Sequence, residues 1–336
     1  MIKVQLFGEI EGRAVDKITL SNNYISISMI TYGMRTTEIK FADRHGSIDN
    51  IVLSYPNLND YLNDNSFLGA ICGRVANRIS GHQFSNESGE HSLEANEGNH
   101  HLHGGSVGFD KRIWQYETHQ ETNSVTFYIT SEDGDMGYPG RCELEVNVAL
   151  QHNQVTTSIN AISNKNSIIN ITDHCYYNLT GDSKQTILNH KLLIPADFVT
   201  PTDHELIPTG EFLNVKKTNF DFSNLRDIHQ TKAFYAPSKG YDINYCLLGD
   251  RYEDKLACKL YDPSSGRQLS IFTTELGLQL YTGGFLSHDG IHGDYTGVAL
   301  EPQNYPNSAN IDHFPSAKIG PNLPYHHTIR HVFEIV

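Results

Sequence analysis

Apolar and polar residues alternate along much of the chain. Serines separate the apolar residues of 25–29, and Glu143, Glu145 and Asn147 separate those of 142–150. A period of two puts successive side chains on opposite faces of a strand, so these segments are predicted to be half-buried strands of antiparallel sheets. The pattern, or a short apolar run, also predicts strands at 125–130, 168–171, 278–282, 298–301 and 328–335.

Turn residues predict one hairpin, and few segments have a helical pattern. Residues 256–261 and 268–272 flank the sequence Asp-Pro-Ser-Ser-Gly at 262–266, which is typical of a hairpin loop. The best helical candidate is a single short turn at 58–63, opened by Pro56 and Asn57. No linker, charge block or repeat interrupts the chain, so we expect one all-β domain over residues 1–336.

Composition narrows the class of protein. The 336 residues are 38% hydrophobic and 19% charged, as in ordinary globular proteins, and the net charge of -14 argues against nucleic acid or anionic lipid as a partner. The five cysteines have wide spacings and no Cys-x-x-Cys pair, which favours reduced thiols in a cytoplasmic protein. We expect neither a signal peptide nor a membrane span.

A first candidate for chemistry is His103, which stands directly before Gly104 and Gly105. Two glycines allow positive φ, so the backbone can turn sharply and present the ring to a cavity. A turn histidine packed for structural reasons is the competing interpretation. His100, His101 and His103 also resemble metal ligands. A nearby Glu and a distant His would normally complete such a site. We therefore expect no metal and no other cofactor.

A second candidate is His174, which follows the apolar segment 168–171 and precedes Tyr176 and Tyr177. If this segment is extended, Thr172, His174 and Tyr176 share one face. A histidine flanked by tyrosines is also often a core residue whose hydrogen bonds are satisfied, and the sequence leaves both possibilities open.

The third candidate is Glu301, which follows the apolar triplet Val298-Ala299-Leu300 and precedes Pro302, where we expect strand pairing to stop. A carboxylate in such apolar sequence is costly unless it is paired or functional. A carboxylate base and an imidazole acid, without a motif for a nucleophile or a metal, point to chemistry that moves only protons.

Polar residues among aromatic and aliphatic ones suggest a ligand with many hydroxyl groups. Asp242 and Gln279 each lie in such surroundings, and Asn77 and Arg78 add further donors and acceptors. Each of these residues could equally be an ordinary surface residue.

Eight motifs, in order, resemble those of the aldose 1-epimerase (galactose mutarotase) family across essentially the whole chain. Any one of them is weak evidence, but their common order is specific. The motifs occupy 73–79, 102–105 with 108–114, 137–140, 172–179, 200–203 with 208–210, 242–245, 279–283 and 301–306.

The resemblance implies a large antiparallel β-sandwich with an open sugar cleft and a cofactor-independent isomerase that interconverts α and β aldohexoses. Glu301 is then the general base on the C1 hydroxyl, His174 the general acid on the ring oxygen, and His103 a further residue at the ring oxygen. The family's hydroxyl-binding positions match a set of five residues. They are Asn77, Arg78, Tyr176, Asp242 and Gln279.

Four positions depart from the family pattern, and two other functions stay open. Asp173 stands where Asn is common, Pro302 follows the base, Tyr305 replaces a frequent Trp and Asn307 replaces a usual Asp. The alternatives are a non-catalytic carbohydrate-binding protein on the same fold, and an epimerase of a modified sugar, such as a phosphorylated one, which would need a basic cluster in the cleft. The preferred sugar and the oligomeric state cannot be read from the sequence.

Overall fold

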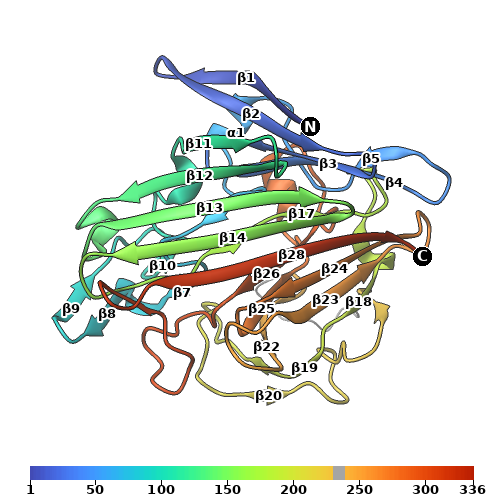
Figure 1. Cartoon of the computed structure of the whole chain (residues 1–336). Coiled ribbons are helices and arrows are strands. Elements are labelled where there is room, and N and C mark those ends of the chain that lie inside the picture. Colours follow the sequence, from blue (N-terminus) through green and yellow to red (C-terminus); the bar gives the residue numbers. More distant parts are fainter. Residues whose placement is uncertain (230–238) are drawn as a thin grey trace.

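Nine antiparallel strands form the largest sheet of the computed structural model, which describes residues 1–229 and 239–336. The long strands lie side by side across the molecule, and the C-terminus follows the end of β28 (Figure 1). The strands, in spatial order, are β11 (Gln115–His119), β12 (Ser124–Ser131), β13 (Cys142–Gln151), β14 (Gln154–Ser163), β28 (Tyr325–Ile335), β24 (Arg267–Thr273), β23 (Lys255–Tyr261), β18 (Lys191–Leu193) and β21 (Arg226–Asp227).

A six-stranded sheet provides the second layer, and a five-stranded sheet is built from the N-terminal strands. The six strands are, in order, β17 (Tyr176–Tyr177), β26 (Val298–Gln303), β25 (Gly277–Tyr281), β22 (Asp242–Leu247), β19 (Ala196–Thr200) and β20 (Leu213–Asn214). The five are β1 (Ile2–Ile10), β2 (Arg13–Ser21), β3 (Ile25–Ile30), β4 (Arg35–Ala42) and β5 (Ile48–Asn50).

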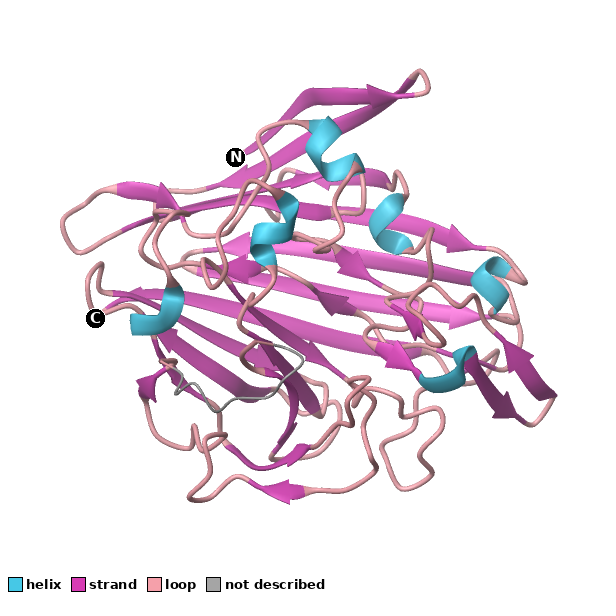
Figure 2. Ribbon diagram, turned by 180° about the vertical axis from the view of Figure 1, so that it is seen from behind, coloured by secondary structure: helices cyan, strands magenta, loops and turns pink. Residues whose placement is uncertain are grey.

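Short ladders and single turns connect these sheets. The ladders pair β6 (Ile71–Cys72) with β16 (Thr172–Asp173), β7 (Arg78–Ile79) with β10 (His101–Leu102), β8 (Gln83–Asn86) with β9 (Gly89–Ser92), and β15 (Ser167–Ile168) with β27 (Lys318–Ile319). The helical segments are short and lie on the connections (Figure 2). They are α1 (Leu58–Leu62) and the 3₁₀ turns Ser80–His82, Phe109–Lys111, Asp135–Gly137, Ile187–Asn189 and Leu286–Asp289.

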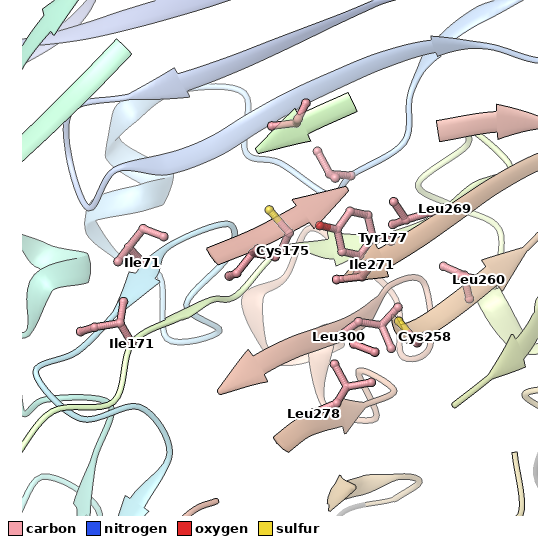
Figure 3. Packing of buried hydrophobic residues seen from close by; sticks show 14 of the residues in the cluster. Ile71, Ile171, Cys175, Tyr177, Cys258, Leu260, Leu269, Ile271, Leu278 and Leu300 are labelled. Carbon is pink, nitrogen blue, oxygen red and sulfur yellow. The ribbon is translucent and has the colours of Figure 1, made fainter. Parts of the chain in front are cut away.

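The core lies between the six-stranded and nine-stranded sheets. Tyr177, Leu278 and Leu300 of the first sheet belong to one buried cluster with Cys258 and Ile271 of the second, and Figure 3 shows these side chains packed together. The predicted all-β class is therefore confirmed, as a large antiparallel sandwich.

Most of the predicted elements are present. The alternating segments form β3, β12, β13, β25, β26 and β28, and the predicted hairpin is the antiparallel pair β23 and β24. The predicted helical turn is α1, where the side chain of Asn57 accepts a hydrogen bond of 3.1 Å from the backbone N–H of Asp60. This cap satisfies one of the free N–H groups at the start of the helix.

Two details of the strand prediction are wrong. The predicted strand at 168–171 ends at Ile168, because the chain leaves its partner β27 there and Asn170 instead bridges to Val75. Pro302 does not end β26, which continues to Gln303. Pro302 pairs with Leu278 in the ladder, and its carbonyl accepts a hydrogen bond from the Thr172 hydroxyl at 3.0 Å.

The five cysteines are all buried and form no disulfide. Within the described ranges, no helix is both long and apolar enough to cross a membrane.

Candidate active site

A cleft of about 710 Å³ collects most of the residues selected from the sequence. It lies over one face of the six-stranded sheet, and loops from elsewhere in the chain complete its walls. Of the eight candidate residues, seven line the cleft: Asn77, Arg78, His103, His174, Tyr176, Asp242 and Glu301.

Strand alternation explains how the sheet supplies its part of the site. In β26 the apolar Leu300 faces the core, so its neighbour Glu301 faces the cleft. The ladder places Gln279 of β25 opposite Glu301, and Asn244 of β22 opposite Gln279. Tyr176 of β17 is two residues further along the same face, opposite Ala299.

The short ladder between β7 and β10 brings Arg78 and His103 together. Leu102 pairs with Arg78, and the backbone N–H of His103 donates to the carbonyl of Asn77 at 3.1 Å. His103 has a φ of 48°, and the following Gly104 has a φ of 89°. A Cβ on Gly104 would lie 1.8 Å from the carbonyl oxygen of Gly73, so the sharp turn predicted at these glycines requires glycine.

His174 and Glu301 form the centre of the site. The His174 Nε2 and Glu301 Oε1 atoms are 3.6 Å apart, and the residues are 5% and 2% exposed. That distance is too long for a hydrogen bond, so each atom keeps its capacity to bond a ligand. The His174 Nδ1 and Glu301 Oε2 atoms are buried without a hydrogen-bond partner among the described residues. Buried polar groups without partners are rare, and at this position they indicate function.

Burial shifts the acid-base behaviour of both groups toward the uncharged form. It lowers the pKa of His174 to about 4. Burial, together with the negative charges of Asp242 and Asp173, raises the pKa of Glu301 well above its ordinary range. A carboxylate with a raised pKa is a stronger base. A neutral imidazole still carries an N–H group, which can donate a proton to a ligand.

His103 lies beside this pair. Its ring centroid is 5.3 Å from that of His174 and 4.5 Å from that of Phe67. The backbone N–H of Asn77 donates to the His103 Nδ1 atom at 3.2 Å, so the neutral ring carries its proton on Nε2. Burial, His174 and Arg78 lower the pKa of His103 well below its ordinary range, which favours this neutral form.

Arg78 and Asp242 line one end of the cleft. Arg78 donates two hydrogen bonds to the Glu97 carboxylate, at 2.6 and 2.7 Å. Gln279 does not line the main cleft: its amide donates to the Asp242 carboxylate at 2.6 Å, within a small adjoining pocket. The structure therefore places Gln279 behind Asp242, where it orients the carboxylate that faces the cleft.

Several cleft residues were missed by the sequence analysis. Glu97 could have been suspected only from its position beside a histidine-rich segment, because the spacing of 19 residues from Arg78 has no regular period. Phe67, Tyr281 and Phe285 add aromatic rings to the lining, and Leu206 adds an aliphatic side chain. Phe67, Phe285 and Leu206 come from connecting segments, where alternation gives no signal, whereas Tyr281 shares a face of the predicted strand 278–282 with Gln279 and could have been selected.

The three clustered histidines do not share a metal site. His101 is bonded to the carbonyl of Glu94 at 2.7 Å and to the hydroxyl of Tyr138 at 2.8 Å, and His100 accepts from the backbone N–H of Gly81. In the part of the chain that the structure describes, no three His, Cys, Asp or Glu side chains are grouped to hold a metal ion.

We therefore expect activity to survive metal removal. Dialysis against EDTA should leave the rate of the expected anomer interconversion unchanged, because both candidate proton-transfer groups are side chains of the protein. A rate that falls after dialysis and returns on addition of Zn²⁺ would contradict this expectation.

The family model described as aldose 1-epimerase matches residues 16–331. Galactose mutarotase of Sus scrofa is 34% identical over 341 residues, covering 98% of each chain, and aldose 1-epimerase of Escherichia coli is 32% identical over 317 residues, covering 91% of this chain and 90% of its own.

Two solved structures share the fold at comparable coverage. An aldose epimerase homologue from C. elegans superimposes with a TM-score of 0.89 at 26% identity, covering 96% of this chain and all of its own. Galactose 1-epimerase from Lactobacillus acidophilus superimposes with a TM-score of 0.87 at 25% identity, covering 99% of this chain and 98% of its own.

Proposed function

The chain belongs to the aldose 1-epimerase family, and from that premise we propose that it interconverts the α and β anomers of aldohexoses such as galactose or glucose. The observation that carries this proposal is the buried pair of His174 and Glu301, whose facing atoms are 3.6 Å apart and do not satisfy each other. The reaction class is that of an isomerase, and the protein's part in it is proton transfer alone.

In the proposed mechanism, Glu301 takes the proton of the C1 hydroxyl while His174 donates a proton to the ring oxygen. The bond between C1 and the ring oxygen breaks, and C1 becomes a free aldehyde. After rotation about the C1–C2 bond, the C5 hydroxyl attacks the other face of the aldehyde. Its proton returns to His174 and the proton on Glu301 passes to the new C1 hydroxyl, so both groups are restored.

The other residues of the site hold the sugar for this exchange. Arg78, Asp242 and Asn77 face the cleft and bond hydroxyl groups, Gln279 supports Asp242 from behind, and the Nε2–H group of His103 donates to the ring oxygen. Tyr176 forms part of the wall, and its hydroxyl donates to the carbonyl of Ser66 at 3.0 Å. Each contribution is a hypothesis about substrate binding.

The charges of the cleft disfavour the modified-sugar alternative. Among the described lining residues, Arg78 is the only arginine or lysine, and Glu97 already engages it. Arg74 is buried and bonds the hydroxyl of Ser131 and nearby carbonyls, whereas Lys111 and Arg112 line a separate surface pocket. A phosphorylated sugar would therefore lack the basic cluster that its charge requires.

The four departures from the family pattern leave the lining unchanged. Within the described part of the cleft, none of Asp173, Pro302, Tyr305 and Asn307 is a lining residue. Asp173 faces a small internal cavity, and burial raises its pKa to about 6. A purely carbohydrate-binding role would not require the buried acid-base pair, which is why we favour catalysis.

The direct test is polarimetry. Freshly dissolved α-galactose and α-glucose should lose their initial optical rotation faster with the protein than without it. Folded protein that leaves the spontaneous rate unchanged across a panel of aldoses would overturn the proposal.

The pH dependence should follow the two shifted groups. As the pH falls through the raised pKa of Glu301, the base takes up a proton, so kcat/KM should decline at a pH above the ordinary glutamate value of about 4.3. His174 is neutral at pH 7, so its titration should add no alkaline limb.

Asp242→Asn removes a negative charge near Glu301 and should therefore move the acid limb of kcat/KM to lower pH. An unmoved limb would show that Asp242 does not act on Glu301.

We further propose that residues 1–336 act as one domain in the cytoplasm, with a neutral sugar as the substrate. One buried cluster includes side chains from Ile18 to Phe333, which supports a single domain. The buried, unpaired cysteines are compatible with a reducing compartment.

A further inference from the structure

The loop that joins β19 to β20 (Figure 1) contains motif segments to which the mechanism gives no role. It begins at Pro201 and includes the sequence Pro208-Thr209-Gly210. Thr202 and Pro208 form a bridge across its base, and the backbone N–H of Thr209 donates to the carbonyl of Pro201 at 2.9 Å. The two ends of the loop are thereby fixed.

Asp203 organises the tip of this loop. Its carboxylate accepts hydrogen bonds from the backbone N–H groups of Glu205 and Ile207, at 2.9 and 3.0 Å. Its own N–H donates to the carbonyl of Ile207 at 2.9 Å, and its carbonyl accepts from the N–H of Leu206 at 3.2 Å. These four bonds enclose Leu206 and define its backbone conformation.

That conformation is unusual for leucine. Leu206 has a φ of 63°, in the left-handed region that residues with a Cβ seldom adopt. Strained residues of this kind persist where the surroundings force them, and they are concentrated at functional sites. A strained leucine therefore requires an explanation, since glycine or asparagine would fit the same turn with less strain.

The side chain of Leu206 supplies that explanation. It is partly buried, and it lines both the main cleft and the small pocket behind Asp242. Among the described residues, only Asn77, Arg78 and Asp242 also line both the cleft and the small pocket. Leu206 is thus the apolar member of an otherwise polar end of the cleft.

We propose that Leu206 is a further specificity-determining residue, which holds an apolar wall against the carbon-bound hydrogens of a neutral aldopyranose. The proposal rests on the proposed function. A sugar ring presents hydroxyl groups at its edge and C–H groups on its faces, so a site that bonds the hydroxyls through Arg78 and Asp242 also needs an apolar surface. The same aliphatic wall disfavours a charged substituent at this end of the cleft.

Leu206→Gly separates this role from a structural one. Glycine adopts the left-handed conformation without strain, so the variant should unfold at a temperature no lower than that of the wild type. The lost apolar contact should raise KM for galactose and glucose by about tenfold, with kcat within about twofold of the wild type. Leu206→Ala should raise KM similarly but should gain no stability, because the strain remains.

The matched control is Lys217→Gly. Lys217 also has a left-handed backbone, with a φ of 62°, but it is exposed and does not line the cleft. Its replacement should leave KM unchanged. A wild-type KM in stably folded Leu206→Gly would overturn the proposal, as would a lower unfolding temperature for Leu206→Gly than for the wild type, which would assign Leu206 a structural role.

A second measurement separates this inference from the proposed function. Calorimetric titration with galactose reports affinity without turnover, so Leu206→Gly can be compared with the wild type even if the protein is inactive. An inactive wild type whose galactose affinity falls about tenfold in Leu206→Gly would refute the catalytic function and support the role of Leu206. Equal affinities would refute the role of Leu206 alone.

Discussion

Glu301→Gln should slow mutarotation by at least about a hundredfold while it changes sugar affinity far less, because a positioned base contributes about 10²- to 10⁴-fold. Glutamine keeps the size of the side chain and an oxygen that accepts a hydrogen bond from the C1 hydroxyl. It cannot accept the proton itself. The measurement is the polarimetric kcat of the variant beside its galactose affinity from calorimetric titration.

A neighbouring carboxylate provides the control for this experiment. Asp242 also lines the cleft and is hydrogen-bonded to Gln279, so Asp242→Asn removes the same charge without removing the proposed base. Its main effect should be on KM. Equal losses of rate and affinity in Glu301→Gln would make Glu301 a binding residue, and a nearly normal rate would direct attention to Asp242 as the base.

The sequence predicted the β-class because alternation is a local property. Where Leu300 faces the core, Glu301 must face the other way, and this inference needs no knowledge of the partner strand. The same reasoning applies to Tyr177 and Tyr176. The residues of the candidate catalytic face could therefore be selected from short segments, and the family resemblance added their proposed roles.

The remaining features depend on contacts between distant segments. Alternation cannot give the register that places Gln279 behind Asp242, nor the partner change that ends the strand at Ile168. The rule that proline stops strand pairing led to an early end for β26, because Pro302 is an exception that pairs inside the sheet. The proposed role of Leu206 could not be found from its residue type, because its side chain reaches the cleft through a backbone conformation that Asp203 helps to set.

His174→Asn should lower the rate by at least about a hundredfold, since the general acid contributes on the same scale as the base. Asparagine can still donate a hydrogen bond to the ring oxygen, but it cannot pass a proton to the oxygen and recover it when the ring closes. Sugar affinity should change much less than kcat, because the other cleft residues still bind the hydroxyl groups. Polarimetry of the variant over a range of galactose concentrations separates the two effects.

His288→Asn is the matched control for this variant, because His288 lines the same cleft but is exposed and has no role in the proposed mechanism. It should retain a nearly normal kcat.

The acid limb of kcat/KM should also persist in the residual activity of His174→Asn, because that limb reports the ionisation of Glu301 rather than of the imidazole. If His174→Asn instead turns over at close to the wild-type rate, His103 becomes the candidate acid: its ring is 5.3 Å from that of His174, and its Nε2–H group is the remaining imidazole donor at the centre of the cleft.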